Sequence, residues 1–470
     1  MHSKLTNTLA KFKQSRTASM LIEIADITLP AFAELVLSTL FGMVDMVMVG
    51  QLSSAAITAV GLTNQPFMLL LAIFAAVNVG TTTLVAWNVG AKRYEKARST
   101  LRQVLIINLI LGTIISIVGV ALAKPIVLFM GAEADVITPA TQYFKIVAAG
   151  LVFQAITMGV TAALRGAGET KIPMLYNVGS NLLNVFGNYA LIYGKFGFPR
   201  LEVIGAAVST TFSRMLACLV SLCVVYFYKK SLISISVKEK FKFEPETIKK
   251  VFSIGLPAAL EQFILQSGLT LFARTVSGLG KEVFAAHQIG INISGLSFSP
   301  SMAFGVAASA LVGQSLGANN EEKAEEYANF IHRVALCVST FVGLMFILFS
   351  HPLARLYNSE AHIVAMAGTV LKILALAQPG QSTQLSLAGA LRGAGDTLYP
   401  LYASATGIWV FRVIAAYIFV NVFGWGLVGA WIALVLDQYT RSLIIFFRFR
   451  SGKWKHMKSR KKELSEVPTE

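Results

Sequence analysis

The stretch ALRGAGETKIP at residues 163–173 returns almost unchanged as ALRGAGDTLYP at residues 390–400. Eight of the eleven letters agree, and the two copies begin 227 positions apart. Two further pairs share this offset: LPAFAE at 29–34 with LPAALE at 256–261, and LVAWNVGAKRYEKA at 84–97 with LVGQSLGANNEEKA at 311–324. The first half of the chain is therefore repeated almost without gaps, which predicts two structurally similar halves.

The overall composition is that of a membrane protein. Hydrophobic residues make up 55% of the 470 residues and charged residues only 14%, and the mean hydropathy is +0.65. Apolar stretches of about 20 residues recur, each long enough to cross a hydrocarbon core of roughly 30 Å as a helix. Lipid-exposed strand edges would leave backbone groups without partners, and the alternating pattern of a barrel is absent. The sequence therefore predicts an all-α integral membrane protein.

We expect twelve transmembrane helices in two pseudo-symmetric six-helix bundles, one for each repeat. The expected helices begin near residues 26, 56, 101, 137, 171, 204, 250, 283, 330, 364, 399 and 426. Because six is even, both repeats enter the membrane from the same side and are parallel. The expected division is an N-terminal segment 1–25, a first lobe 26–228, a basic linker 229–249, a second lobe 250–448 and a basic tail 449–470.

The formal net charge of +16 comes from basic residues at the chain ends and in loops. Lys and Arg concentrate in the N-terminal segment, in GAKRYEKARSTLR at 90–102, in the linker and in the tail. With twelve spans these regions share one side, and the positive-inside rule places both termini in the cytoplasm. We expect a multi-pass protein of the cytoplasmic (inner) membrane that contacts lipid headgroups and has no nucleic-acid partner.

Other features of the sequence are expected to have no special role. The N-terminus lacks the pattern of a cleaved signal peptide, so we expect no leader to be removed. Cys218, Cys223 and Cys337 lie in apolar stretches without ligand-like spacing, which predicts neither a disulfide nor a metal site. We expect the protein to be a monomer.

Parallel repeats of this kind occur in transporters, which hold the substrate between two halves and rock one half against the other. Several ordered motifs point to one such family: MVDMVMVG at 43–50, LVAWNVGA at 84–91, LVGQSLGA at 311–318, the two LRGAG turns, and NLLNVFGNYALIYGKFG at 181–197. Over residues 20–450 the chain resembles the multidrug and toxic compound extrusion (MATE) family. The resemblance implies a cation-coupled antiporter that exports organic compounds, with a central cavity between two six-helix lobes.

Several arginines lie in or near the expected spans. The two LRGAG motifs predict cytoplasmic turns after the fourth span of each half, where glycine supplies unusual backbone angles and Arg165 or Arg392 can reach the headgroups. Asp437 is expected near Arg412 or Arg441. Pairing would reduce the cost of these charges within the membrane.

Ionisable and amide side chains gather on two spans of the first half. Asp45 lies five residues before the first apolar run ends, and Glu34 lies eleven residues before Asp45, on nearly the same helix face. An ionisable residue inside a span is a functional hypothesis by default. The fifth span carries a continuous amide face: Asn177, Asn181, Asn184 and Asn188. Such a stripe either joins helices or forms part of an ion site.

The second half lacks this constellation. At the offset of 227, Asp45 corresponds to Phe272, and the four asparagines correspond to Ser404, Ile408, Phe411 and Ala415. Packing that the architecture requires should recur in both halves, so the asymmetry favours an ion site in the first lobe. Carboxylate and amide oxygens suit Na⁺, while burial of a carboxylate also favours its protonated form. Na⁺ and H⁺ therefore both remain open.

The resemblance to the MATE family implies roles for particular residues. Asp45 matches the acidic coupling residue of the first span, Asn184 and Asn188 match a polar pair, and Thr210 matches a threonine of the same lobe. Some relatives have aspartate where this chain has Asn188, so more weight falls on Asp45. Transient Na⁺ at Asp45 is possible, but no resident metal and no cofactor is expected.

The predicted substrate cavity includes Glu34, Glu261, Gln381 and His287. Glu34 and Glu261 are a symmetric pair, which fits a shared structural role as well as cargo binding. Relatives with a sodium site in the second lobe have acids at the positions of Leu265 and Gln381, so this chain departs from the family there. His287 lies inside a span near the second lobe, where a hydrogen-bonded packing role is favoured over a proton relay.

Three functional classes are compared. An antiporter that exports organic, cationic compounds in exchange for Na⁺ or H⁺ fits the inward-facing acids. A flippase for lipid-linked precursors is the alternative within the same superfamily and would need a cationic cavity able to hold pyrophosphate. A membrane-embedded transferase would need a catalytic cluster at the interface, which the loops lack, so we expect no enzyme. The absence of a GxxxxGK[ST] motif argues against ATP as the direct energy source.

Overall fold

The computed structural model describes residues 16–236, 242–457, 460, 463 and 464; the rest of the predicted N-terminal segment, linker and tail lies outside these residues. The first half forms α2 (Arg16–Gly50), α3 (Ser54–Gly90), α4 (Tyr94–Ala121), α5 (Ala123–Phe129), α6 (Ala134–Ala149), α7 (Leu151–Gly166), α8 (Lys171–Tyr193) and α9 (Glu202–Phe227). The second half forms α10 (Pro245–Ser277), α11 (Lys281–Gly317), α12 (Glu321–Arg355), α13 (Ala361–Gly393), α14 (Leu398–Ala405), the π-helical η1 (Thr406–Ile414), α15 (Ala415–Tyr417), the π-helical η2 (Ile418–Val422), α16 (Gly426–Arg450) and the 3₁₀-helix η3 (Lys453–His456).

The twelve predicted spans all have counterparts in the described part of the chain. Nine helical stretches are long and apolar enough to cross a membrane, and α6 with α7, bent by 43° between them, makes a tenth. The more polar α8 and α10 have 23 and 33 residues and supply the other two. Several helices start earlier than predicted, α2 at Arg16 and α4 at Tyr94. Hydropathy marks only the part of a helix in hydrocarbon, whereas the helix continues into the interface.

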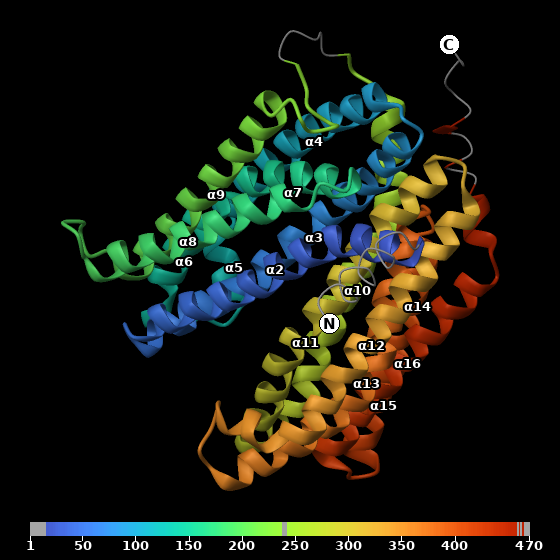
Figure 1. Ribbon diagram of the computed structural model, residues 1–470. Coiled ribbons are helices and arrows are strands. Elements are labelled where there is room, and N and C mark those ends of the chain that lie inside the picture. Colours follow the sequence, from blue (N-terminus) through green and yellow to red (C-terminus); the bar gives the residue numbers. More distant parts are fainter. Residues whose placement is uncertain (1–15, 237–241, 458–459, 461–462, 465–470) are drawn as a thin grey trace, which may run out of the picture.

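The helices form two bundles that meet along α3, α10 and α11. In the first bundle α2 packs against α8, α8 against α9, and α3 and α4 against α7; in the second, α11, α12 and α16 pack around α13. Contacts of α3 with α10 and of α11 with α2 and α3 join the bundles. Figure 1 shows the two bundles diverging from this common end, from which the linker between α9 and α10 also extends. The six-plus-six arrangement is therefore confirmed.

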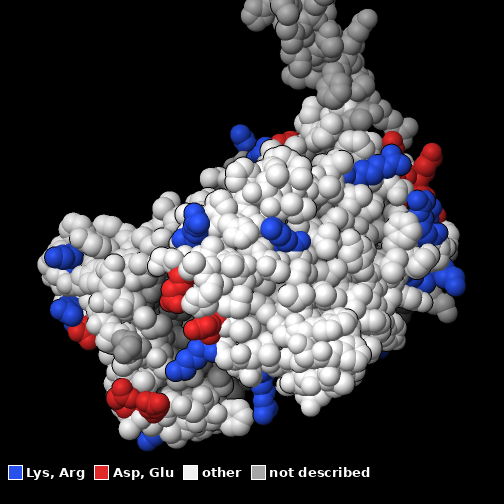
Figure 2. All heavy atoms as spheres, turned by 90° about the horizontal axis from the view of Figure 1, so that it is seen from below, with Lys and Arg blue, Asp and Glu red and all other residues white. Residues whose placement is uncertain are grey.

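The outer surface of the bundles is largely apolar. Figure 2 shows broad areas of one face without Lys, Arg, Asp or Glu. Large hydrophobic side chains on these helices are exposed, among them Ile117 at 63%, Phe341 at 61% and Leu348 at 60%. In a water-soluble protein so much exposed apolar area would be unfavourable, whereas lipid tails accommodate it.

Two hydrogen bonds join the bundles at the common end, and the two bonds are related to each other by the internal repeat. Trp87 Nε1 of the first bundle donates to the carbonyl of Gly393 at 2.8 Å, and Gln314 Nε2 of the second donates to the carbonyl of Gly166 at 2.9 Å. Donors and acceptors each correspond at the offset of 227. We call this contact the seam. It closes the bundles at the end where α10 begins, because Trp87 and Glu246, which lies in the first turn of α10, border the same small pocket. Since α10 begins at Pro245, inside the predicted linker 229–249, this is also the linker end.

Glycines allow the backbones to approach closely at the seam. A Cβ atom on Gly90 would lie 1.9 Å from the carbonyl oxygen of Gln314, and one on Gly317 would lie 2.1 Å from the carbonyl oxygen of Trp87. Both distances are far below van der Waals contact, so these positions accept only glycine while the seam is closed. The repeated GA at the ends of LVAWNVGA and LVGQSLGA is thereby explained by interhelical packing.

The two LRGAG turns have the same backbone, as the repeat predicts. Gly168 and Gly395 have φ of +85° and +82°, in the left-handed region that glycine adopts without strain. Two residues later, Thr170 donates to the main chain of α2 at 3.1 Å and Thr397 to the main chain of α10 at 2.7 Å. Each turn therefore fixes the fifth span of its half against the first helix of that half.

Glu244 joins the end of the linker to α4. Its carboxylate accepts hydrogen bonds from Lys96 Nζ at 2.8 Å, Ser99 Oγ at 2.7 Å and Thr247 Oγ1 at 2.8 Å. Burial alone would raise the pKa of Glu244, but these hydrogen bonds outweigh it and lower the pKa from 4.5 to about 2.

We expect Glu244→Gln to lower the thermal midpoint of unfolding at neutral pH. A carboxyl with a depressed pKa stabilises the fold above its unfolded value of 4.5, and this stabilisation is lost as pH falls toward 2. The difference between variant and wild type should therefore shrink across that range. Glu95→Gln is the control, because the Glu95 side chain is 74% exposed in its pair with Arg98. An equal loss at all pH values would contradict the assignment.

Candidate functional site

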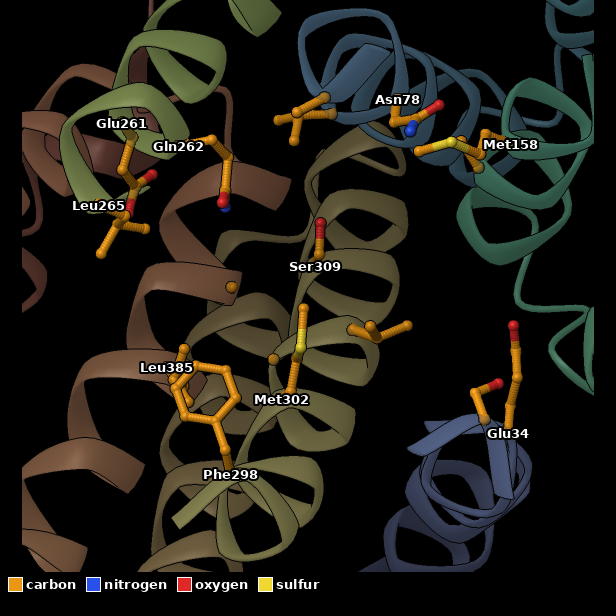
Figure 3. A pocket seen from close by; sticks show the side chains of 18 of the residues that line it. Glu34, Asn78, Met158, Glu261, Gln262, Leu265, Phe298, Met302, Ser309 and Leu385 are labelled. Atoms are coloured by element: carbon orange, nitrogen blue, oxygen red, sulfur yellow. The ribbon is translucent and has the colours of Figure 1, made fainter. Parts of the chain in front are cut away.

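A cavity of about 910 Å³ lies between the two bundles and is lined by residues of both. Figure 3 shows Glu34 projecting from α2 and Met158 from α7, with Glu261 on α10 and Phe298 and Met302 on α11. A cavity of this size, with apolar walls and a few polar groups, can hold a drug-sized organic molecule. The repeat therefore places a large ligand cavity on the pseudo-symmetry axis between the halves.

The two cavity glutamates are each paired with the arginine of an LRGAG motif. Glu34 Oε1 lies 2.9 Å from Nη2 of Arg165, and Glu261 Oε2 lies 2.7 Å from Nη2 of Arg392. The predicted headgroup position of both arginines is therefore wrong. The carboxyl side chains are only 8% and 2% exposed, and a charge so buried is strongly unfavourable without a partner.

A third polar side chain completes each pair. Asn177 Nδ2 donates to Glu34 Oε1 at 2.7 Å, and Ser404 Oγ donates to Glu261 Oε1 at 3.0 Å. Since Asn177 and Ser404 also correspond at the offset of 227, the whole constellation recurs in both lobes. One oxygen, Oε2 of Glu34, is buried without a hydrogen-bond partner among the described residues.

We expect Glu261→Gln to destabilise the protein, because it leaves the charge of Arg392 without its partner. Adding Arg392→Gln should restore part of the loss, giving an interaction of about 1–3 kcal/mol in a double-mutant cycle from unfolding of the purified protein. The same cycle on Asp26 and Lys171, whose side chains are 61% and 65% exposed, should give less than about 1 kcal/mol. Additive effects at Glu261 and Arg392 would show that the pair contributes nothing specific.

The amide face of α8 lies along α2. Asn181 Nδ2 donates to Ser38 Oγ at 3.1 Å, and Asn188 Nδ2 donates to Asp45 Oδ1 at 2.8 Å. With the bond between Asn177 and Glu34, the two helices are joined over three turns. The predicted common face of Glu34 and Asp45 is confirmed, since both side chains meet α8.

Asn184 links Asp45 to α9. Only one orientation of its amide suits both sides: the nitrogen then donates to Asp45 Oδ2 at 2.8 Å, and the oxygen accepts from Thr210 Oγ1 at 3.2 Å. Asn184 and Asn188 are 6% and 1% exposed. The structure therefore brings together Asp45, Asn184, Asn188 and Thr210, the four predicted coupling residues. Thr210 lies behind the amide and does not directly contact the carboxylate in this arrangement.

Arg214 on α9 is a charged residue of this region that sequence reasoning missed. It lines the cavity, its guanidinium carbon lies 4.7 Å from the centre of the Phe67 ring, and it is close enough to Asp45 and Tyr143 for electrostatic interaction. The signal was present in the repeat, because Arg214 corresponds to Arg441. Arg214 thus lies between the Asp45 site and the cavity.

The second lobe has a different charged cluster at the cavity wall, which we call the triad: Arg412, Asp437 and Arg441. Arg412 Nη2 lies 2.6 Å from Asp437 Oδ2, and Arg441 Nε lies 2.9 Å from Asp437 Oδ1. The prediction that Asp437 lies near Arg412 or Arg441 is confirmed for both. Arg412 and Arg441 line the cavity.

The remaining predicted cavity residues divide into two groups. Gln381 lines the cavity, as does Leu265. His287 lies elsewhere, enclosed by the rings of Phe272, Phe284 and Trp431 with centroid distances of 5.5, 5.8 and 5.6 Å. The structure thus places His287, which is 2% exposed, in the packed core of the second lobe and not among the residues that line the cavity. Its Nδ1 has no hydrogen-bond partner among the described residues.

The described residues contain no group of three or more His, Cys, Asp or Glu side chains that could hold a metal ion. At Asp45 the carboxylate supplies oxygen ligands for a hard monovalent ion but no strong divalent site. The amide nitrogens of Asn184 and Asn188 face the carboxylate, so each amide would have to turn for its oxygen to join such a site.

The comparisons with known proteins agree with this geometry. The family model described as MatE matches residues 30–190 and 257–418, one copy on each half. The chain belongs to the MATE family. The probable multidrug resistance protein NorM of Thermotoga maritima is 33% identical over 439 residues, with 92% of each chain covered. The multidrug resistance protein PmpM of Pseudomonas aeruginosa is 28% identical, with 84% of this chain and 83% of PmpM covered.

A solved MATE-family transporter of the MOP superfamily, described as outward-facing, superimposes with a TM-score of 0.86 at 24% identity. The match covers 93% of this chain and 99% of the other. At that identity the likeness establishes the fold. The MATE chain described here is accordingly a multi-pass helical membrane transporter with its two lobes around a central cavity.

Proposed function

We propose that this MATE transporter is a secondary active antiporter that exports organic compounds in exchange for Na⁺ or H⁺. The observation that carries the proposal is the Asp45 site, a carboxylate with two amide partners in one lobe, next to a cavity large enough for cargo. A carboxylate inside a membrane protein can bind a cation or a proton in place of its hydrogen-bond donors, because either one neutralises the charge. The multidrug names of its relatives support efflux.

The conformation supports an alternating-access cycle. The seam closes the bundles at the linker end, which the positive-inside rule assigns to the cytoplasm. We therefore interpret the structure as outward-facing, the state in which Asp45 would take up the coupling ion. Ion binding neutralises the carboxylate and favours rearrangement of the first lobe, which opens the other side. We further propose that both termini lie in the cytoplasm and that the protein resides in the inner membrane. A monomer is sufficient for this cycle, which needs no cofactor and includes no catalytic step.

The charge of the cargo depends on the paired glutamates. Cationic cargo was expected from the acids alone, but a cation can bind Glu34 or Glu261 only in competition with Arg165 or Arg392. Arginines outnumber acids on the cavity wall. This excess of positive charge supports the second candidate, a flippase for lipid-linked precursors, which needs a cationic cavity. The sequence alone gave less support to that candidate. We propose that Glu34 and Glu261 shape cargo affinity and that Asp45 provides coupling.

The test uses the purified full chain in vesicles. Uptake of a fluorescent organic cation and of a matched neutral dye is followed while a pH gradient or a Na⁺ gradient is imposed alone. Acceleration by one gradient identifies the ion and supports antiport. Dependence on neither gradient, together with transbilayer movement of a prenyl diphosphate lipid, would support the flippase and overturn the antiporter.

A further inference from the structure

We propose that the triad binds an anionic group of the cargo, a carboxylate or a phosphate, so that cargo of this transporter includes amphiphilic anions. The inference rests on the proposed function and names a substrate class for its cavity. It concerns Arg412, Asp437 and Arg441 in the second lobe, which contribute to neither the Asp45 site nor the glutamate pairs.

Charge is the first argument. Among the described residues, the cavity wall contains five arginines and two glutamates: Arg165, Arg214, Arg392, Arg412 and Arg441 with Glu34 and Glu261. The glutamates neutralise two of the arginines, and Asp45 lies near a third. In the triad two guanidiniums share one carboxylate, so one positive charge remains without a counterpart. A buried charge in this position is unfavourable until an anion joins it.

Burial and geometry are the second argument. The side chains of Arg412 and Arg441 are 7% and 5% exposed, and that of Asp437 is 0% exposed. Both arginines nevertheless line the cavity, so their guanidinium groups border whatever enters it. Nε of Arg412 is itself buried and has no hydrogen-bond partner among the described residues, so this guanidinium is not fully satisfied by the protein. Planar guanidiniums bind carboxylate and phosphate oxygens through parallel, charge-assisted hydrogen bonds.

The backbone of η1 leaves space for the side chains of the triad. A Cβ atom on Gly407 would lie 2.5 Å from Asp437 Oδ1 and 2.5 Å from Cγ of Arg441, so glycine is required where these side chains cross η1. Arg412 lies on the π-helical η1, where the first lobe has the regular helix α8. Single π turns occur frequently at functional sites. Beyond the triad, apolar and sulfur-containing residues line the cavity wall, among them Phe298 and Met302, which suits an amphiphilic body.

The first lobe shows that the fold does not require the triad. At the offset of 227, Asp437 corresponds to Thr210 and Arg412 corresponds to Val185. Only Arg441 has a basic counterpart, Arg214. Packing needed by both bundles would recur, as the glutamate pairs do, whereas the triad is confined to one lobe. This asymmetry favours a binding role over a scaffold role.

The experiment compares two probes that differ only in charge, dansylglycine and its methyl ester. Binding to the full-length purified protein is measured by fluorescence. Arg412→Gln leaves Asp437 paired with Arg441 and removes the excess charge. We expect the ratio of acid to ester affinity to fall about tenfold or more in Arg412→Gln, to recover in part in Arg412→Lys, and to rise in Asp437→Asn. Arg274→Gln, an exposed charge of the same lobe, controls for net charge.

The outcomes separate the two proposals. An unchanged ratio in Arg412→Gln, or an equal affinity of the wild type for acid and ester, overturns the anion site. If Arg412→Gln fails to fold, Arg412→Lys and Asp437→Asn are used instead. An acid-to-ester affinity ratio equal to that of the wild type in both variants would also overturn the anion site. Gradient-driven transport of the ester by the wild type tests the proposed function independently of the triad.

Competition identifies the source of the anion. A prenyl diphosphate that displaces dansylglycine when the corresponding prenol does not would assign the site to lipid-linked precursors. Displacement by 1-naphthoate but not by the prenyl diphosphate would assign it to small carboxylates. Displacement by neither would overturn the site, because a site that recognises carboxylate and phosphate groups must accept one of these anions.

Discussion

Replacing Asp45 with asparagine is expected to abolish gradient-driven export while the protein stays folded and still binds cargo. The substitution keeps the shape of the side chain and one oxygen that accepts from an amide, and it removes the charge that binds the coupling ion. The new NH2 group can pair with Asn184 once that amide turns its oxygen toward it. Losing a half-buried carboxylate should change the free energy of unfolding by no more than about 1 kcal/mol. Export from vesicles under each gradient, and release of the ion on cargo addition, are the measurements.

Asp26→Asn is the matched control, because Asp26 is an acid on the same helix but is 61% exposed in a pair with Lys171. It should export at the wild-type rate. Asn188→Ala should cause a smaller loss than Asp45→Asn, since it removes one amide and leaves the charge. If Asp45→Asn exports normally and still exchanges the ion, the site is misassigned and Glu261 becomes the leading candidate.

Phe272, the counterpart of Asp45 in the second lobe, has a structural role that the sequence did not indicate. Phe272→Leu would be expected to have little effect if Phe272 were only the empty counterpart of Asp45. In the structure Phe272 is 1% exposed, packs on His287, and lies 5.9 Å from the guanidinium of Arg412. A change there would loosen the triad, so Asp26 is the better control.

Replacing Gly90 with alanine is expected to shift the protein away from the outward-facing state. The new Cβ would lie 1.9 Å from the carbonyl oxygen of Gln314, so the seam must separate. Overpacking of this kind costs about 1–3 kcal/mol, which changes the ratio of two states about 5- to 150-fold. The helix itself is not weakened, because alanine is a better helix former than glycine.

The measurement is labelling of Ser309→Cys from the cytoplasmic side, in a background without Cys218, Cys223 and Cys337. Ser309 lines the cavity on α11, and Figure 3 shows it facing the space between the bundles. Gly90→Ala should raise the labelling rate in inside-out vesicles. Gly61→Ala on the same helix is the control, since no atom lies within 4 Å of its Cβ position. Equal labelling in all three proteins would mean that the seam does not hold the state.

The asymmetry between the lobes links these experiments. The Asp45 site belongs to the first lobe and the triad to the second, while the glutamate pairs and the seam occur in both. Arg214 lies between the Asp45 site and the cavity, so occupancy of Asp45 by an ion changes the electrostatic surroundings of a cavity residue. Under our proposals, coupling belongs to the first lobe, the anion site belongs to the second lobe, and the glutamate pairs of both lobes contribute to cargo affinity.

The repeat could be read directly from the sequence, and much follows from it. Lipid leaves few choices for the backbone, so apolar length alone predicts the spans, and two copies of one pattern predict two bundles. The turn glycines Gly168 and Gly395, and the common face of Glu34 and Asp45, are properties of a local helix or turn. Local periodicity therefore determined them. Comparing the copies also located Asp45 and its asparagines, because Phe272 broke the symmetry.

Contacts between distant segments needed the tertiary structure. Arg165 and Arg392 looked like headgroup anchors because hydropathy places them at a span end, yet the fold brings them to buried carboxylates 131 residues away in each half. The same holds for the seam, where Trp87 meets a carbonyl 306 residues further along. His287 was assigned to the wrong surface, since a one-dimensional pattern cannot tell which helix face meets a cavity. The sequence by itself determined the architecture and which side chains surround Asp45, whereas the charge of the cavity was decided by packing, because pairing depends on which side chains are brought within about 3 Å.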